Sequence, residues 1–354
     1  MDSNPLSEKG AARVVRFDVP PIVTPAFINK ELNLLNRIAI SFAEGTYFSG
    51  GLLKDYDAVL IFHMAHAFGT VLGGYVPMER TVILPMFLGE FYRKFMGVAQ
   101  AYIDMEREVL QAASHIQTPS AAEKKVLVEN YGAKEDAVFV VPRGFNPELF
   151  RRRKRELDKS RGRIDILCAN VVRMQKGQHI LVPILEVCEK LGTNAVFHLP
   201  GVNGTTYSKH YNEYAESLRA EIEERGFGNN FKFYGVLDQK QLGELMLTMD
   251  MAIYPSVAET FGKSALESMA TGLPTIVFDD VPAFGEFIEH RKTGLLVKRS
   301  PESAAVAIAE LAKDGGLYSS VSNEGIERGR DFEWGKVIPR LLDELVGRLG
   351  GREG

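Results

Sequence analysis

The fold is decided by one stretch, Met251-Ala252-Ile253-Tyr254-Pro255-Ser256-Val257-Ala258-Glu259-Thr260-Phe261-Gly262-Lys263-Ser264-Ala265-Leu266-Glu267. Its apolar beginning, 251–255, predicts a buried strand. The residues after the loop predict a helix that stops at Gly272-Leu273-Pro274. Residues 275–278 form another apolar run and predict the next strand. Strand, loop, helix and strand in this order are typical of a parallel α/β sheet.

The loop between this strand and its helix is predicted to bind an anion. Open α/β sheets place their ligands at the carboxyl ends of the strands, where this loop lies. The backbone amides of Phe261, Gly262 and Lys263 fall at or near the N-terminus of the helix, which attracts negative charge. Two carboxylates, Glu259 and Glu267, flank these amides eight positions apart.

A plainer interpretation of the same stretch stays open at this point. Ser264-x-x-Glu267 matches a capping box, in which the Glu267 carboxylate would bond only backbone amides. Glu259 would then be an ordinary solvated acid in a loop. Short motifs match by chance, so the stretch alone does not separate the two interpretations.

Length and composition indicate a soluble globular protein with two domains. The chain has 354 residues, of which 45% are hydrophobic and 25% are charged. The net charge of -4 argues against a nucleic-acid partner. Cys168 and Cys188 lie in apolar runs without metal-ligand spacing, so we expect reduced core thiols in a cytoplasmic protein. No signal peptide or membrane-spanning run is evident in the sequence.

Residues 1–150 are predicted to form the first domain, with an irregular polar segment at the start. Strands are expected at 13–19, 57–63, 81–85, 115–119 and 138–142, and helices at 27–43, 87–111 and 120–131. The long helix carries Phe87, Phe91 and Phe95 with Arg93 and Lys94 beside them. Such a stripe usually faces a core, and peripheral contact with a membrane is the alternative.

Residues 151–163 hold eight lysines and arginines and are predicted to be a solvated linker. The second domain, 164–330, alternates regularly and predicts a doubly wound sheet. Its strands are expected at 164–171, 195–199, 231–234, 251–254, 275–278 and 294–297, and its helices at 178–191, 211–225, 239–248, 283–289 and 301–314. Residues 331–354 are predicted to be a final helical segment, helical over 334–349.

Two cations are predicted at the ligand edge of the second sheet. Arg173 and Lys176 lie in the turn between the first strand and first helix of this domain, where a guanidinium fork and an ammonium could hold a phosphate. Ordinary surface charges are the alternative. One D-x-D, Asp55-Tyr56-Asp57, precedes its strand and is interpreted as a turn, so no metal site is predicted.

The stretch around Glu259 and Glu267 resembles the E-x7-E signature of the retaining GT-B glycosyltransferases of group 1, which are related to glycogen and sucrose synthases. The resemblance covers nearly all of the chain from about Asp57 onward. It implies two Rossmann-like doubly wound domains that face a cleft. It also implies that Glu259 faces the donor sugar, that the loop amides hold sugar and phosphate, and that Glu267 holds the ribose. Thr260 and Lys263 stand where the family usually has glycine and an apolar residue, which bears on donor choice.

Further roles follow from the same resemblance. Arg173 and Lys176 are implied to hold the donor diphosphate, and Val236 and Leu237 lie in the stretch that binds the base. His63 or His66 is implied to reach toward the donor sugar, and a loop histidine without a special role is the alternative. The final helix is implied to brace the first domain. Complete members have an opening strand, Gly-Gly loop and helix that this sequence lacks, so we expect either a reduced N-terminal domain or an N-terminally shortened product.

The expected function is transfer of a sugar from a UDP- or GDP-linked donor to a glycan, lipid or small-molecule acceptor, with retention of configuration and without a cofactor. A non-catalytic nucleotide-sugar-binding or partner subunit is the first alternative, because the opening is missing. A phosphorylase or a sugar-nucleotide epimerase on the same fold is the second. The expected location is cytoplasmic, with the inner membrane surface as a variant of it.

Overall fold

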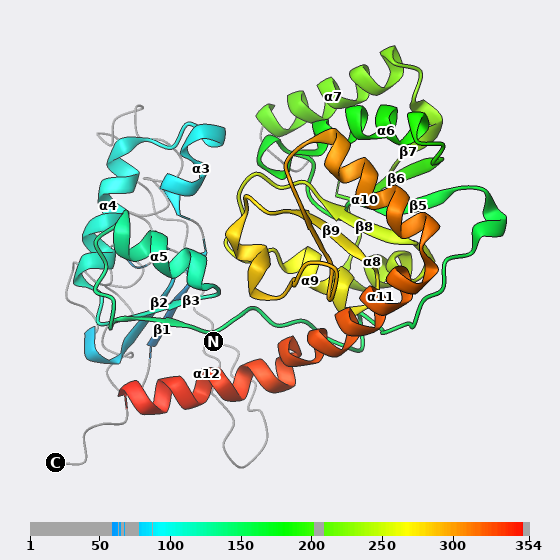
Figure 1. The fold of residues 1–354 in the computed structure, drawn as a ribbon. Coiled ribbons are helices and arrows are strands. Elements are labelled where there is room, and N and C mark those ends of the chain that lie inside the picture. Colours follow the sequence, from blue (N-terminus) through cyan, green and yellow to red (C-terminus); the bar gives the residue numbers. More distant parts are fainter. Residues whose placement is uncertain are drawn as a thin grey trace, which may run out of the picture.

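The computed structural model describes residues 59–62, 64, 67, 78–86, 88–201 and 209–349. They form two parallel sheets that lie side by side, each with its own helices (Figure 1). We refer to the unit around the first sheet as the N-terminal domain and to the unit around the second as the C-terminal domain.

The described residues of the N-terminal domain form a four-stranded parallel sheet with helices on both faces. Alternate strand residues point to opposite faces, so Ile83 packs under helices α3 to α5, whereas Val82 and Leu84 pack against the final helix α12. The strands are in chain order, β1-β2-β3-β4. The elements are β1 (Val59–Phe62), β2 (Thr81–Leu84), α3 (Gly89–Met96), α4 (Gln100–Ala112), β3 (His115–Thr118), α5 (Ala121–Glu129) and β4 (Val138–Val140).

The C-terminal domain is a six-stranded parallel sheet in the order β10-β9-β8-β5-β6-β7. The order reverses between β5 and β8, which makes this the switch point where ligands bind. Helices cover both faces, so the strands are apolar on both sides. The elements are β5 (Ile164–Leu167), α6 (Leu181–Lys190), β6 (Ala195–Leu199), α7 (Lys209–Glu224), β7 (Phe231–Phe233), α8 (Gln239–Thr248), β8 (Met251–Tyr254), α9 (Lys263–Ala270), β9 (Thr275–Phe278), β10 (Leu295–Val297), α10 (Pro301–Lys313) and α11 (Gly315–Gly329).

The strand predictions are confirmed wherever the structure describes the chain. β6, β8 and β9 have the predicted bounds, and the other strands whose predicted ends are described are shorter at one end. The helix predicted over 87–111 is wrong, because Gly97 adopts a left-handed conformation with φ 58° and separates α3 from α4. The helix predicted over 283–289 is only a short 3-10 turn, Pro282–Glu286.

Helix α11 was not expected, because its glycines disfavour a helix. Tertiary packing explains it. A Cβ on Gly329 would lie 2.5 Å from the Cβ of Ala270, and one on Gly325 would lie 3.0 Å from the Met269 side chain. The glycines of α11 therefore allow it to approach α9 closely, and the contact offsets the low helix propensity.

The segment 151–163, predicted to be a solvated linker, is exposed at most of its described positions, and Arg155 is the exception. Arg155 is only 6% exposed and donates hydrogen bonds to the carbonyl oxygens of Met246 and Met249, at 2.8 and 2.6 Å, where α8 ends. Arg161 forms ion pairs with Asp165 and Asp250. These two arginines attach the segment to the C-terminal domain. Arginine is suited to this contact because its N–H groups can donate to the carbonyl oxygens at a helix end.

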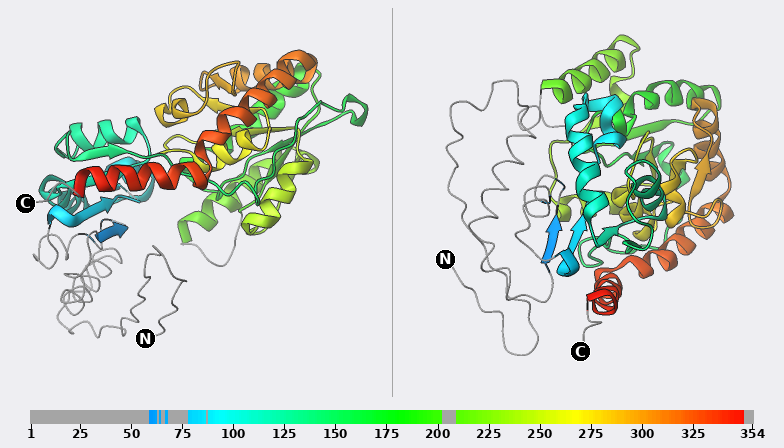
Figure 2. Two further views of the ribbon diagram at one scale, coloured as in Figure 1. Left: turned by 90° about the horizontal axis from the view of Figure 1, so that it is seen from below. Right: turned by 90° about the vertical axis from the view of Figure 1, so that its left-hand side faces the viewer.

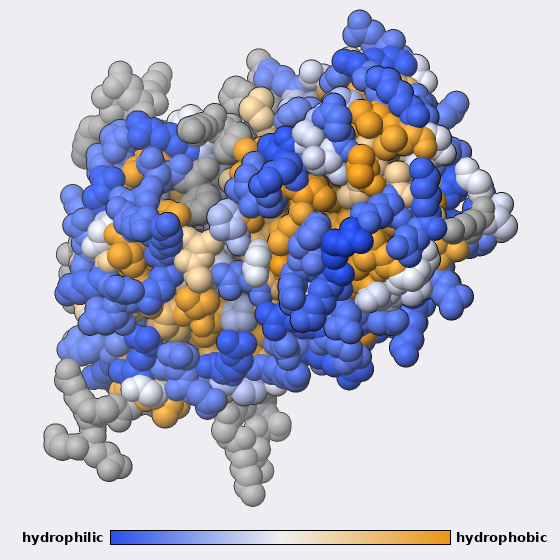
Figure 3. Space-filling view, viewed as in Figure 1, coloured by the Kyte–Doolittle hydropathy of each residue, from blue (hydrophilic) through white to orange (hydrophobic). Residues whose placement is uncertain are grey.

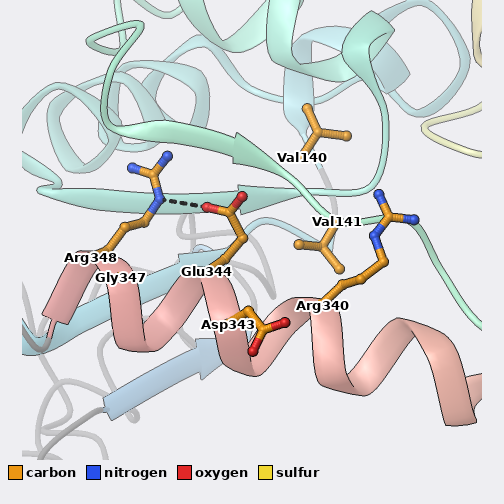
Figure 4. Close-up of a pocket in the computed structure, with 7 residues that line it drawn as sticks. All are labelled: Val140, Val141, Arg340, Asp343, Glu344, Gly347 and Arg348. Carbon is orange, nitrogen blue, oxygen red and sulfur yellow. Dashed lines mark hydrogen bonds and ion pairs between the residues drawn. The ribbon is translucent and has the colours of Figure 1, made fainter.

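Helix α12 (Trp334–Leu349) leaves the C-terminal domain and runs back along the N-terminal domain (Figures 1 and 2). Its buried residues Val337 and Leu345 pack on the first sheet. At its far end, Arg348 donates to Glu344 at 3.2 Å and to the carbonyl oxygen of Asp136 at 2.9 Å, beside a shallow cavity whose wall includes Val140 (Figure 4). Hydrophilic side chains dominate the face of the molecule shown in Figure 3, and the largest apolar areas lie over the C-terminal domain.

Several predictions fall outside the described residues. These are the strand at 13–19, the helix at 27–43, the turn at 55–57, and the side chains of Phe87, Phe91 and Phe95. The core and membrane interpretations of the phenylalanine stripe therefore both stay predictions. Within the described ranges, no helix is both long and apolar enough to cross a membrane.

Candidate functional site

The loop after β8 is shaped by Gly262, the residue that precedes α9. Gly262 has φ 92°, and a Cβ there would lie 2.5 Å from the ring of Phe284. Glycine is therefore required both by the backbone conformation and by the packing. The capping-box interpretation is wrong, because the N-cap is Gly262 and Ser264 already lies inside the first turn.

Glu259 is not a solvated acid. Its Oε1 atom accepts hydrogen bonds from the Lys176 ammonium at 2.5 Å and from the Ser256 hydroxyl at 2.6 Å. The side chains of Lys176 and Glu259 are only 12% and 11% exposed. They meet because β5 and β8 are neighbours in the sheet, although 83 positions separate them in sequence. The ion pair joins two loops that were both predicted at the ligand edge of the sheet. The sequence did not predict that the two loops touch.

Three further contacts fix the two loops against each other. Gly177 has φ 69°, and a Cβ on it would lie 2.2 Å from the carbonyl oxygen of Pro255. The Val257 amide donates to the carbonyl oxygen of Gln175 at 2.9 Å. Arg299, just beyond β10, donates to the carbonyl oxygens of Pro255 and Ser256 at 3.0 and 2.7 Å. Arg299 was missed by sequence reasoning, and its position two residues after a strand at the ligand edge is the signal that could have found it.

Glu267 is 3% exposed and forms an ion pair with Lys263, one helical turn before it. Burial raises the pKa of Glu267, and the Lys263 ammonium opposes that rise in pKa. Lys263 is itself 39% exposed. One oxygen of Glu267 is thus already engaged by a residue of its own helix.

A cavity of about 380 Å³ opens between the two domains at this loop. Its wall brings together Lys176, Glu259 and the loop residues Thr260 to Lys263. The N-terminal domain contributes Met86 and Arg143, and Trp334 comes from the start of α12; none of the three was predicted for the site. The other residues of the wall are Asn170, Tyr254, Ser264, Ala265 and Phe284.

Arg173, Val236 and Leu237, which were also predicted for the site, are not among the residues that line this cavity. The guanidinium of Arg173 lies against Gln175, whose amide oxygen, turned toward it, accepts from Nε at 2.9 Å. Val236 is 55% exposed and Leu237 is half-buried, both after β7 at the ligand edge of the sheet. His63 and His66 are outside the described residues.

The amides at the start of α9 are available to a ligand. Within the part of the chain that the structure describes, no group accepts a hydrogen bond from the amides of residues 261–264. The first amides of a helix have no partner within the helix and carry its positive dipole end. The side chain of Phe261 is 2% exposed, with its ring centroid 5.4 Å from that of Phe287, which anchors these amides to the core.

The N-terminal domain touches this loop directly. The Ser120 hydroxyl donates to the carbonyl oxygen of Thr260 at 2.6 Å, and the Ala121 amide donates to Glu286 at 2.6 Å. Both donors belong to the beginning of α5. Ser120 also caps α5, because its hydroxyl accepts from the Glu123 amide at 3.0 Å. The same hydroxyl therefore caps a helix and holds the two domains together.

Comparison with known proteins gives the class of this chain. Residues 150–328, half of the sequence, match the family described as glycosyl transferases group 1. The chain belongs to that family.

Solved structures confirm the fold. Sucrose-phosphate synthase from Thermosynechococcus elongatus superimposes with a TM-score of 0.76 at 19% identity, over 95% of this chain and 84% of that one. Anabaena HepE in complex with UDP-glucose gives 0.71 at 18% identity, over 89% and 84%. The architecture is GT-B, with two Rossmann-like domains.

Curated relatives are more similar in sequence. A D-inositol 3-phosphate glycosyltransferase of Acidothermus cellulolyticus is 29% identical over 245 residues, 67% of this chain and 54% of that protein. A mannosylfructose-phosphate synthase of Agrobacterium fabrum is 22% identical over 254 residues, 70% and 56% respectively. The chain thus spans just over half the length of these two relatives.

Proposed function

We propose that the protein transfers a sugar from a nucleotide-diphosphate sugar to an acceptor hydroxyl, with retention of the anomeric configuration. The observation that carries this proposal is the buried Lys176–Glu259 ion pair beside the unpaired amides of residues 261–264, in one cavity between two domains. Membership of the glycosyl transferases group 1 supports it.

The leaving diphosphate is proposed to bind the amides before α9, together with Lys176 and Arg173. Preorganised donors of this kind stabilise developing charge without reorganisation, which is the main contribution expected of such a site. A diphosphate would compete with Glu259 for the Lys176 ammonium. Freed from Lys176, Glu259 would orient the donor sugar at the same position. We propose that these fixed positive charges stabilise the leaving diphosphate in the role that a metal ion has in other enzymes.

Retention follows if the acceptor attacks from the face that the diphosphate leaves. The bond between the anomeric carbon and the phosphate oxygen breaks, the bond to the acceptor oxygen forms, and the acceptor proton passes to the departing phosphate. This step needs no separate general base. Glu267 is proposed to hold the ribose with its second oxygen, with Val236 and Leu237 at the base. His63 or His66 is proposed to face the donor sugar.

The test separates binding from turnover. Calorimetric titration with UDP and GDP, and NMR assays of UDP-hexose hydrolysis and transfer, would be run on the wild type, Glu267→Ala, Glu259→Gln and the surface control Glu289→Ala. We expect Glu267→Ala to weaken nucleotide binding roughly 10-fold or more, which corresponds to one lost charge-assisted hydrogen bond. Glu259→Gln should mainly lower turnover, and Glu289→Ala should change neither.

Two results would reject the proposal. One is that both site variants bind donor and turn over like the wild type. The other is a transferred sugar with inverted configuration. Nucleotide-sugar binding with no transfer and no hydrolysis in the wild type would instead favour a non-catalytic binding subunit. We propose UDP as the first nucleotide to test, because the HepE neighbour was solved with UDP-glucose.

The location is also a proposal. Cys168 and Cys188 are both free and buried, which suits a reducing compartment such as the cytoplasm. Association with the inner membrane surface is tested by co-sedimentation with vesicles that contain anionic lipid. Retention of the protein in the supernatant would reject membrane association.

A further inference from the structure

Arg143 is a cation that the N-terminal domain contributes to the wall of the cavity. It follows β4 and lies on the cavity wall with Lys176 and Glu259. Its Nη2 atom lies 3.1 Å from the Met86 sulfur, a weak acceptor. Within the described part of the chain, no carboxylate forms an ion pair with Arg143.

Of the three cationic side chains that line the cavity, Lys176, Lys263 and Arg143, the first two form ion pairs with carboxylates. Lys176 is neutralised by Glu259 and Lys263 by Glu267. The carboxylate that acts on Arg143 from a distance is Glu123, which is fully buried and whose second oxygen accepts from the Thr118 hydroxyl at 2.6 Å.

Glu123 neutralises Arg143 only in part. Burial raises the pKa of Glu123 to about 7, so that near neutral pH its carboxyl is only partly ionised. Burial also lowers the pKa of the Arg143 guanidinium. A partly buried guanidinium that faces a cavity without a carboxylate partner is a favourable place for an anionic ligand.

The indole ring of Trp334 packs on the backbone of Gly144, the residue that follows Arg143. A Cβ on Gly144 would lie 2.5 Å from the indole ring, so the ring packs directly on the backbone next to Arg143. The Trp334 amide also donates to the carbonyl oxygen of Phe145 at 3.1 Å. The side chain is still 39% exposed and lines the cavity. It offers a rigid apolar surface next to the cation.

We propose that Arg143 is a phosphate-binding residue that the N-terminal domain contributes to this cavity, with Trp334 as the apolar wall beside it. The planar fork of arginine matches two phosphate oxygens at once, and residues 261–264 of the C-terminal domain line the same cavity. This inference deepens the proposed function and rests on it for the source of the phosphate. That phosphate belongs either to the donor diphosphate or to a phosphorylated sugar or polyol that accepts the transferred group.

The sequence contains one tryptophan, so fluorescence excited selectively in the tryptophan band reports on Trp334 and its surroundings. Fluorescence titrations, repeated by calorimetry, would use pyrophosphate, UDP, and glucose 6-phosphate or glucose in the presence of saturating UDP. The variants are Arg143→Met, Arg143→Lys and Arg107→Met. Arg107→Met removes one positive charge from α4 of the same domain, away from the cavity. Circular dichroism would check that each variant is folded.

We expect Arg143→Met to lower the affinity for at least one of the phosphate probes roughly 10- to 100-fold, which is the effect of losing one bidentate charge-assisted contact. Arg143→Lys should retain part of the affinity, and Arg107→Met should stay within about twofold of the wild type. A loss of affinity for pyrophosphate and UDP assigns Arg143 to the diphosphate of the donor. A loss for glucose 6-phosphate, with UDP binding unchanged, assigns it to a phosphorylated acceptor.

Equal affinities of Arg143→Met and Arg107→Met for all three phosphate probes would overturn the inference. So would a folded wild type that binds none of the probes. The proposed function fails separately. If Glu259 and Glu267 variants bind UDP and turn over normally while Arg143→Met loses pyrophosphate, the site assignment is wrong but the phosphate-binding role of Arg143 stands.

Discussion

Replacing Gly177 by alanine tests whether the two loops of the site are held together as the structure indicates. Gly177 has φ 69°, and its added Cβ would lie 2.2 Å from the Pro255 carbonyl oxygen. Gly192 is a matched control, because its φ is 71° and a Cβ there would meet nothing within 4 Å. Both substitutions impose the same backbone strain, and only the first imposes a clash.

The expected cost follows from these two contributions. A left-handed conformation costs an L-residue about 1–2 kcal/mol, which applies to Gly177→Ala and Gly192→Ala alike. Overpacking against a fixed group adds about 1–3 kcal/mol to Gly177→Ala alone. The Pro255 carbonyl cannot move freely, because Arg299 donates to it at 3.0 Å. Gly177→Ala should therefore lower the free energy of unfolding by about 1–3 kcal/mol more than Gly192→Ala does.

Urea unfolding of the two variants, followed side by side by circular dichroism, measures the difference. UDP affinity provides a second measurement: Gly177→Ala should lose roughly 10-fold or more because the Lys176–Glu259 pair is displaced, whereas Gly192→Ala should bind like the wild type. Equal stability and equal UDP affinity of the two variants would refute the packing argument.

Three further predictions concern the rest of the molecule. Burial raises the pKa of Glu106 to about 8, so its stabilising contribution is present below the ordinary pKa near 4.5 and is lost as the pH rises through about 8. Glu106→Gln keeps an acceptor for the Tyr131 hydroxyl and should remove up to roughly 4–5 kcal/mol of this pH dependence, measured as Tm between pH 5 and 9; an unchanged profile would contradict it. Arg155→Met removes the two hydrogen bonds to the carbonyl oxygens of Met246 and Met249 and should lower the free energy of unfolding by about 2 kcal/mol, whereas a solvated linker would show no loss. Leu345→Ala should cost about 2–3 kcal/mol because that side chain is packed on the first sheet, while its neighbour Val346→Ala, 71% exposed, should stay within about 0.5 kcal/mol; equal effects would mean that α12 does not pack as described.

Local patterns in the sequence were sufficient for most of the fold. The apolar runs that became β8 and β9 are each buried on both faces, and such runs are recognisable without any tertiary information. The helices that were missed or misjudged depend on other elements. Helix α11 exists because its glycines fit against α9, and the 87–111 helix is interrupted where Gly97 turns left-handed. Neither the fit nor the turn has a periodic signal.

The candidate site was predicted in part, and the division has a physical cause. Glu259, the loop amides and Lys176 could be assigned to one edge of a sheet, because parallel strands present their carboxyl ends on the same side. The ion pair between Lys176 and Glu259 could not be predicted, because it depends on β5 lying next to β8. Strand alternation fixes that the strands are parallel and leaves their order open.

The sequence by itself thus determined the alternating architecture, and also the sheet edge and the loop at which we propose that a ligand binds, since each of these follows from residues close together in the chain. Only the tertiary structure decided which charges neutralise each other and which remain to attract a ligand. Arg143 and Trp334 reach the cavity because the chain returns through α12 to the N-terminal domain. Contacts between residues so far apart in sequence are set by packing of the completed domains, and no local pattern encodes them.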